Sequence, residues 1–177
     1  MFIGVKELER QKLIIDHSFA PGTIDYRTQE FRQVAPLVVQ VVAELKDGVI
    51  HVVGQFATRI ELTCARCLEP VEREVRSQFD LPYRPVAAVA REPEVNLAEE
   101  DTEVGFYVGD GLFLADVLAE QVHLALPMKT LCREDCRGLC PRCGANLNRE
   151  SCRCHHPGID PRLAPLAEWK DRHKKQS

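Results

Sequence analysis

Apolar and polar side chains alternate along most of residues 37–83, which predicts a β-sheet with one buried face. One alternating run covers 37–45, a second covers 50–62, and a third covers 71–83. Between the first two lies Asp47-Gly48, a strong signal for a two-residue hairpin turn. Such a turn puts the apolar sets of both strands on one face, because it pairs Leu45 with Ile50, Ala43 with Val52, and Val39 with Phe56.

The other predicted elements are shorter. Residues 11–19 and 104–108 are expected to form short strands, and 109–111 a turn. A helix is expected over 114–126, ended by Pro127, because apolar residues recur along one side at three- and four-residue spacing. These residues are Leu114, Val117, Leu118, Val122 and Ala125. A short final helix is expected to begin at Asp160-Pro161, with Leu163, Leu166 and Trp169 on its apolar side.

Charge is distributed unevenly over the 177 residues. Residues 1–128 carry 12 Lys/Arg and 21 Asp/Glu, whereas residues 129–177 carry 11 Lys/Arg and 6 Asp/Glu. Residues 85–103 contain six of the acids and are expected to form an exposed acidic loop, with an acidic docking segment as the alternative. Any RNA contact is therefore expected in the basic C-terminal part, with an affinity that falls as salt rises.

The N-terminal residues are interrupted by charges every few positions and lack the apolar middle segment of a signal peptide. No apolar run in the sequence approaches the roughly 20 residues that a membrane span needs. We therefore expect a cytoplasmic protein, in which the reducing environment disfavours disulfides. The eight cysteines, which fall in close-spaced sets, then need another explanation.

The cysteine spacing is typical of metal-binding knuckles, since a Cys-x2-Cys turn directs two sulfurs to one point and zinc prefers four tetrahedral ligands. Cys140-Pro-Arg-Cys143-Gly144 is the most specific signal, because its glycine permits the positive φ that such a knuckle commonly needs. Two zinc ions per chain are predicted. The expected ligand sets are Cys140, Cys143, Cys152 and Cys154 for one site, and Cys64, Cys67, Cys132 and Cys136 for the other.

Alternatives to this partition stay open. Cys132 and Cys136 could join Cys140 and Cys143 instead, and His155 or His156 could replace one thiol. A thioredoxin-like role for Cys64-x2-Cys67 is disfavoured, because that motif belongs at a helix N-terminus and predicted strands flank this one.

No catalytic motif can be assembled from the residues. Two closed four-thiolate sites leave no open coordination position for catalytic zinc. The sequence contains no His-Glu-x2-His, no Gly-rich phosphate loop, no Gly-x-Ser-x-Gly and no His-x-Glu of the zinc deaminases. We therefore expect that the protein is not an enzyme.

Five arginines are directly adjacent to cysteines in the sequence: Arg66, Arg133, Arg137, Arg142 and Arg153. They could offset the negative charge of thiolate sites, or they could contact phosphates. Under the second interpretation the candidate RNA-binding residues are Arg137, Arg142, Lys170, Lys174 and Lys175.

Four stretches of the sequence, taken together, resemble one known family. They are Cys64-Ala-Arg-Cys67-Leu-Glu-Pro70, Glu120–Pro127, the run from Cys132 through Asn148, and Asp160–Leu166. These stretches resemble the YceD family, whose members are called large ribosomal RNA subunit accumulation proteins. The resemblance implies a role in accumulation or maturation of 23S rRNA, and it offers no established catalytic residues.

Taken together, these patterns predict an α+β fold: an antiparallel β-sheet, as a meander or partial barrel, with one packed helix and a C-terminal cysteine-rich zinc module. The expected domains are 1–127, the sheet and helix, and 128–177, the zinc-binding module with a basic C-terminal helix. The expected function is non-catalytic support of 23S rRNA accumulation and large-subunit assembly, by binding rRNA or an assembly intermediate. One alternative is a zinc-braced protein–protein adaptor or regulator that docks a ribosomal protein, and another is a thiol redox sensor.

Overall fold

The computed structural model describes residues 1–86 and 104–154, together with residues 162, 166 and 169. Contacts between residues group the chain into two compact units. The first unit comprises Met1–Ala65 and Glu69–Cys132, and the second comprises Arg66–Leu68 and the described residues from Arg133 on.

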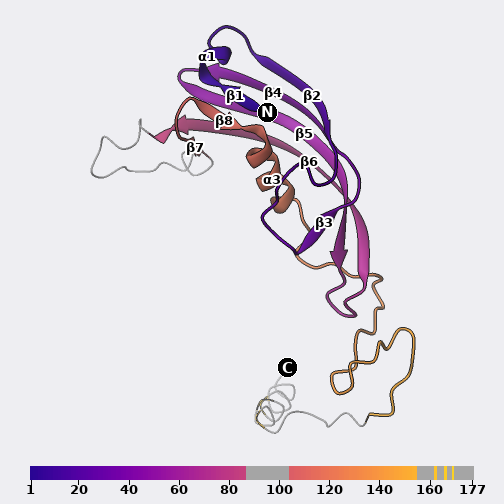
Figure 1. The fold of residues 1–177 in the computed structure, drawn as a ribbon. Coiled ribbons are helices and arrows are strands. Elements are labelled where there is room, and N and C mark those ends of the chain that lie inside the picture. Colours follow the sequence, from indigo (N-terminus) through magenta and orange to yellow (C-terminus); the bar gives the residue numbers. More distant parts are fainter. Residues whose placement is uncertain (87–103, 155–161, 163–165, 167–168, 170–177) are drawn as a thin grey trace. The chain divides into compact units, whose positions relative to one another are not determined.

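The first unit is mainly β-sheet, with one packed helix (Figure 1). Its larger sheet has the strand order β2-β4-β5-β6-β7, and β3 pairs with β5. The strands are β2 (Leu13–Phe19), β3 (Phe31–Gln33), β4 (Leu37–Lys46), β5 (Val49–Thr63), β6 (Pro70–Pro85) and β7 (Gly105–Tyr107). A second, two-stranded sheet pairs β1 (Phe2–Gly4) with β8 (Gly111–Phe113). The helices are α1 (Val5–Leu8) and α3 (Leu114–Leu124).

The central hairpin has the predicted register. Asp47 and Gly48 have φ values of 51° and 79°, the paired positive values of a tight hairpin turn whose twist matches that of its strands. The three predicted pairs, Leu45–Ile50, Ala43–Val52 and Val39–Phe56, are all present.

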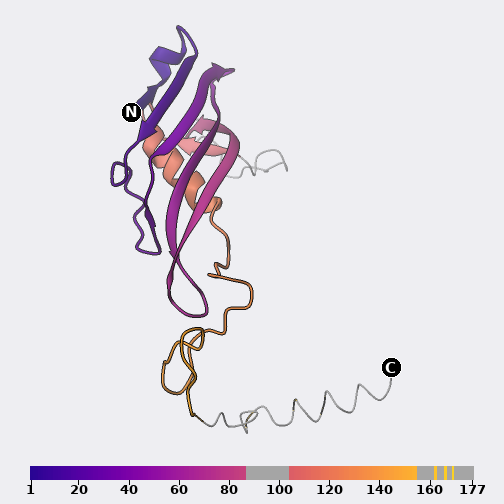
Figure 2. The same cartoon turned by 90° about the vertical axis from the view of Figure 1, so that its right-hand side faces the viewer.

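The core lies between one face of the long strands and helix α3, which runs along that face (Figure 2). The inward residues of β4 and β5 alternate as predicted, and the largest of them are almost wholly buried. The helix contributes its predicted apolar side: Leu114, Val117, Leu118 and Val122 are buried, and Ala125 packs against the same cluster. Burial of this continuous apolar surface is the main stabilising contribution to the unit.

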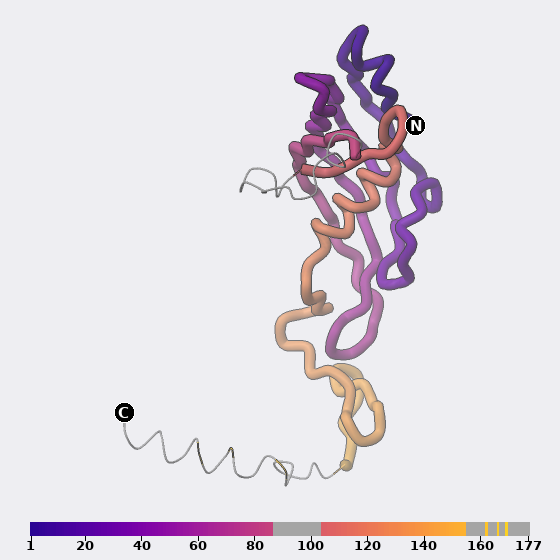
Figure 3. The backbone as a smooth tube through the Cα atoms, turned by 90° about the vertical axis from the view of Figure 1, so that its left-hand side faces the viewer, coloured from indigo at the N-terminus to yellow at the C-terminus, as the bar shows by residue number. Residues whose placement is uncertain are grey.

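The structure differs from the sequence-based expectation in three respects. Helix α3 ends at Leu124 rather than at residue 126, because a residue before proline disfavours the α conformation and the chain leaves the helix early. Strand β7 pairs with β6 in parallel, which the long connection of residues 86–104 permits. The short elements β1, α1, β3 and β8 were not predicted. Figure 3 traces how the N-terminal residues return beside the segment that precedes α3.

Several predicted features lie outside the described residues. These are residues 87–103 of the predicted acidic loop, His155 and His156, most of the predicted final helix, and the basic tail. Within the part of the chain that the structure describes, no helix combines the length and the apolar character needed to cross a lipid bilayer.

Candidate metal centres

All eight cysteines lie within the described residues, as thiols rather than disulfides. The structure gathers them into two groups of four, and in each group the sulfur atoms all lie within 4.8 Å of one another. The first group is Cys64, Cys67, Cys132 and Cys136, and the second is Cys140, Cys143, Cys152 and Cys154. These are the two sets that the spacing predicted, and the alternative in which Cys132 and Cys136 join Cys140 and Cys143 is not the arrangement observed.

The loop that carries Cys64 connects β5 to β6. The backbone N–H of Cys64 donates a hydrogen bond of 2.8 Å to the carbonyl of Glu69, which closes the loop over the Cys-x2-Cys turn. The adjacent Ala65 N–H donates to the Thr130 carbonyl at 2.8 Å, and this bond draws in the chain that follows α3. One bond reaches a sulfur: the Cys132 N–H donates to Sγ of Cys64 at 3.3 Å. Such a donor favours the thiolate form of the sulfur that accepts it.

Cys136 has its own supporting contacts in the second unit. Arg66 donates through Nη1 to the carbonyls of Glu134 and Cys136, at 3.1 and 2.9 Å, so its guanidinium holds the loop around this cysteine. Nδ2 of Asn148 donates to Sγ of Cys136 at 3.3 Å. Oδ1 of the same side chain accepts the backbone N–H of Arg137 at 2.8 Å. Asn148 therefore supplies a donor to the sulfur and fixes the neighbouring backbone at the same time.

The second cysteine group begins with a knuckle like the one at Cys64. The N–H of Cys140 donates to the Ala145 carbonyl at 2.8 Å, the same five-residue closure found between Cys64 and Glu69. Gly144 has φ 74°, the positive value expected of it from the sequence. The two Cys-x2-Cys turns thus share one local geometry, and each presents its two sulfurs on the same side of a tight turn.

Protonation within the second group is set by hydrogen bonds between its members. Backbone N–H groups of Cys143 and Arg142 donate to the Cys140 sulfur and lower the pKa of this thiol to about 6, which favours its thiolate form. A hydrogen bond with the Cys143 side chain, together with burial, raises the pKa of Cys154 to about 12. A divalent cation would take the place of the retained proton, so metal binding releases protons and strengthens as pH rises.

The donor set and the distances in both groups fit a metal ion. A tetrahedral ion with bonds of 2.3 Å to sulfur places its ligands about 3.8 Å apart, and sulfurs within 4.8 Å of one another need only small side-chain adjustments to reach that spacing. The two groups differ in exposure. Cys64, Cys67 and Cys136 are buried and Cys132 is exposed, whereas in the second group only Cys140 is buried.

The predicted RNA-binding residues are only partly described. Arg137 and Arg142 are exposed, and the backbone N–H of Arg137 is held by Asn148 at 2.8 Å. Lys170, Lys174 and Lys175 lie outside the described residues. The structural roles of Arg66 and Asn148 were not predicted. The sequence signals these roles only through the proximity of both residues to cysteines. Arg and Asn side chains carry several hydrogen-bond donors, which can reach loop carbonyls and sulfurs.

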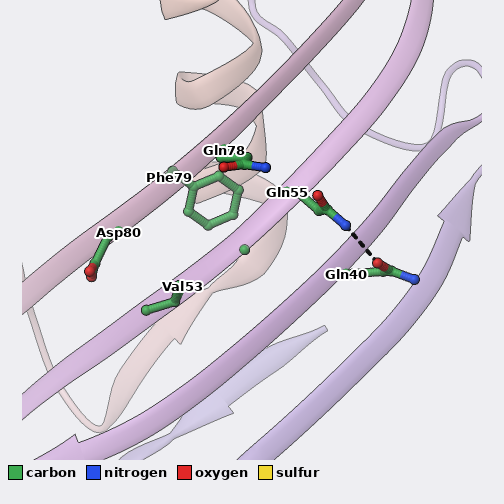
Figure 4. A pocket seen from close by; sticks show the side chains of 7 residues that line it. Gln40, Val53, Gln55, Gln78, Phe79 and Asp80 are labelled. Atoms are coloured by element: carbon green, nitrogen blue, oxygen red, sulfur yellow. Dashed lines mark hydrogen bonds between the residues drawn. The ribbon is translucent and has the colours of Figure 1, made fainter.

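A separate surface feature lies on the sheet. Gln40, Gln55 and Gln78 are cross-strand neighbours on β4, β5 and β6 and line a shallow hollow of about 480 Å³ (Figure 4). Nε2 of Gln55 donates to Oε1 of Gln40 at 2.8 Å. Among the described residues, Asp80 supplies the one carboxylate of the lining. The hollow contains none of the predicted site residues, and its amides are suited to hydrogen bonding with a neutral surface.

Comparison with known proteins identifies a family that this chain matches. Residues 52–170 match the family described as large ribosomal RNA subunit accumulation protein YceD. An uncharacterized protein of Mycobacterium tuberculosis is 37% identical over 127 residues, which cover 72% of this chain and 58% of that protein. A Zea mays protein named large ribosomal RNA subunit accumulation protein YCED homolog 1, chloroplastic, is 28% identical over 175 residues, covering 85% of this chain and 58% of that protein.

An Arabidopsis thaliana protein of the same name is 27% identical over 161 residues, with 77% of this chain and 49% of that protein covered. The chain therefore spans about half the length of these relatives. No solved structure matches it. The resemblance seen in the sequence is confirmed, and because the match covers more than half of its residues, the chain belongs to the YceD family of large ribosomal RNA subunit accumulation proteins.

Proposed function

We propose that this protein is a non-catalytic factor that supports accumulation of 23S rRNA during large-subunit assembly, by binding the rRNA or an assembly intermediate. The observation that carries the proposal is the family match over residues 52–170. The name of the plant relatives points in the same direction. The proposed contact uses the basic residues 129–177, because phosphates attract Lys and Arg through counterion release.

Among the described arginines of the second unit, two are engaged with neighbouring groups and two are proposed to contact phosphate. Arg66 is engaged with the carbonyls of Glu134 and Cys136, and we assign it a structural role. Arg133 is likewise held by Oδ1 of Asn148, at 2.9 Å. Arg137 is exposed, and only its backbone is held by Asn148. We therefore propose Arg137 as a phosphate contact. The exposed Arg142, in the knuckle of the second cysteine group, is proposed as another.

We further propose that each cysteine group holds one zinc ion. Four thiolates in a tetrahedral arrangement suit zinc or an iron–sulfur centre. Zinc is favoured by the two Cys-x2-Cys knuckles, which are typical of structural zinc sites. A site closed by four thiolates has no open position for substrate, which supports a binding role rather than a catalytic one. Metal analysis distinguishes the two metals directly, since a colourless protein with two zinc per chain is expected and a brown, iron-containing protein would contradict the assignment.

The RNA proposal is tested by recovering RNA with the tagged full-length protein from cells. We expect 23S rRNA or its precursor to be retained at moderate salt. The triple variant Lys170→Glu, Lys174→Glu and Lys175→Glu and the single variant Arg137→Glu should each lose most of it. Lys12→Glu, an exposed change in the first unit with the same single charge reversal, is the matched control for Arg137→Glu. Recovery of protein partners without rRNA, unchanged by nuclease, would support the adaptor instead and contradict direct RNA binding.

A further inference from the structure

A second hollow of the first unit, of about 360 Å³, is lined by aromatic side chains and carboxylates. Exposed aromatic rings are unusual at a surface without a partner, yet Phe2, Phe106 and Phe113 are 44%, 50% and 58% exposed here. The rings of Phe2 and Phe113 lie with centroids 5.0 Å apart at an angle of 59°. An aromatic wall of this kind attracts apolar groups and, through its ring faces, cations.

The hollow is built by pairing between distant segments. Strand β1 pairs with β8, and Phe2 lies opposite Phe113 in that register. On β7, Gly105 pairs with Tyr83 of β6, and a Cβ at Gly105 would lie 2.5 Å from Cε1 of the tyrosine ring. The glycine therefore allows the Tyr83 ring to lie directly over the strand. The result is a formed wall rather than a chance gathering of loop residues.

The charged groups that the described residues contribute to the lining have one sign. They are Asp110, Asp116 and Glu120, and no described Lys, Arg or His lines the hollow. Asp116 already pairs with a guanidinium, since Nη2 of Arg27 lies 3.2 Å from its Oδ1 at the rim. Asp110 and Glu120 are exposed and add negative charge beside the rings.

We propose that this aromatic–acidic hollow binds arginine side chains presented by a basic segment of another protein. A guanidinium is planar, stacks on aromatic faces and donates two parallel hydrogen bonds to a carboxylate. The hollow offers both partners, with Phe106 and Phe113 for stacking and Asp110 and Glu120 for ion pairing. Nucleic acid is disfavoured as the occupant because its phosphates are repelled by the same carboxylates.

The proposal extends beyond RNA binding and uses residues in the first unit only. The two charged parts of the sequence then bind partners of opposite charge. The basic residues 129–177 bind a polyanion, and the acidic hollow binds a polycationic protein segment. A protein that holds a basic polypeptide and RNA at once would bring the two together without any catalytic group.

Titration calorimetry on the full-length, metal-loaded protein tests the proposal. The probe is a capped peptide of alternating glycine and arginine, compared with the same peptide carrying lysine. We expect the arginine peptide to bind more tightly. The double variant Asp110→Asn, Glu120→Gln should weaken its binding about fivefold or more, and Phe106→Ala about threefold, as expected for exposed ion pairs and cation–π contacts. Glu30→Gln removes one exposed carboxylate outside the lining and should change affinity by less than about twofold.

Three outcomes would overturn the proposal: no binding by the unaltered protein at about 1 mM peptide, equal affinity for both peptides, or an equal loss with Glu30→Gln. Hydrogen exchange on the unaltered protein provides a measurement independent of any variant. Peptide binding should slow exchange at Phe2–Gly4 and Gly111–Phe113, and protection elsewhere without protection there would also contradict the assignment. RNA recovery should be unaffected by the hollow variants, so failure here is distinguishable from failure of the RNA proposal.

Discussion

Leu68 and Gly144 occupy the same position in two cysteine knuckles, and both are in the left-handed region, with φ values of 60° and 74°. Each residue directly follows the second cysteine of a Cys-x2-Cys turn. Glycine adopts this conformation without penalty, whereas a residue with a Cβ pays roughly 1–2 kcal/mol for it. One knuckle is therefore built without backbone strain, and the other retains a strained leucine whose side chain is exposed.

This difference gives a prediction for paired substitutions. Leu68→Gly should raise the free energy of unfolding by about 1 kcal/mol, because the backbone strain is relieved and the exposed leucine side chain gives up little buried surface. Gly144→Ala should lower it by about 1 kcal/mol, since an added Cβ meets no atom within 4 Å and only the backbone penalty remains. Urea midpoints measured with metal bound test both changes. Gly144→Asn is the control and should cost less than Gly144→Ala, because asparagine tolerates the left-handed region.

Removing one cysteine pair should remove one metal ion. Protein purified without added metal or chelator is expected to contain two zinc per chain, and Cys64→Ser with Cys67→Ser, or Cys140→Ser with Cys143→Ser, should each leave one. The single change Cys143→Ser should expose residues 133–154 to protease while β4 and β5 stay protected, because a closed zinc site contributes folding energy to its own loops. Full metal content with unchanged protease resistance in these variants would contradict the assignment of ligands.

Stability at alkaline pH should report on Tyr83. Burial, with a smaller effect from the Glu120 charge, raises the pKa of Tyr83 from 10.0 to about 12, so the folded protein favours the neutral phenol. The stabilising effect is fully present below pH 10 and is lost as pH rises from 10 towards 12, because the unfolded chain ionises first. Tyr83→Phe should therefore lose less stability than the unaltered protein over this range. If the free energies of unfolding of the two proteins fall in parallel between pH 10 and 12, burial does not raise the pKa of Tyr83.

Replacing the buried Gln33 should lower the free energy of unfolding more than replacing an exposed polar residue does. Its Nε2 donates to the carbonyls of Phe19 and Ala35 at 3.1 and 2.8 Å, and its Oε1 accepts from the Tyr26 hydroxyl at 3.0 Å. Gln33→Ala removes all three hydrogen bonds, although the Ala35 carbonyl still accepts one from the Thr58 hydroxyl at 3.0 Å, and it should cost about 2–3 kcal/mol of unfolding free energy. Gln40→Ala, at an exposed position of the sheet, is the control and should change stability by about 0.5 kcal/mol or less. Similar losses at both positions would contradict the structural role of Gln33.

The sequence alone determined the features that depend on near neighbours. The positive-φ turn at Asp47-Gly48 specifies the register of β4 and β5, since a two-residue turn leaves one pairing that buries both apolar sets. The apolar side of α3 follows from its three- and four-residue spacing. The knuckle at Cys140–Gly144 is readable because the chemistry and the required backbone lie within five residues.

Only the tertiary structure decided the pairings between distant segments. Strands of three residues such as β1 and β8 are too short to show a period, and Phe2 meets Phe113 only because packing around α3 brings the two strands together. The contact of Cys132 with Cys64 spans 68 positions, and the roles of Asn148 and Arg66 depend on which carbonyls and sulfurs the folded loops present. Turns, helix faces and knuckles depend on residues that are close in the sequence, so the sequence alone predicts them. Contacts across long loops depend on the burial and hydrogen bonding of the whole chain, so only the folded structure determines them.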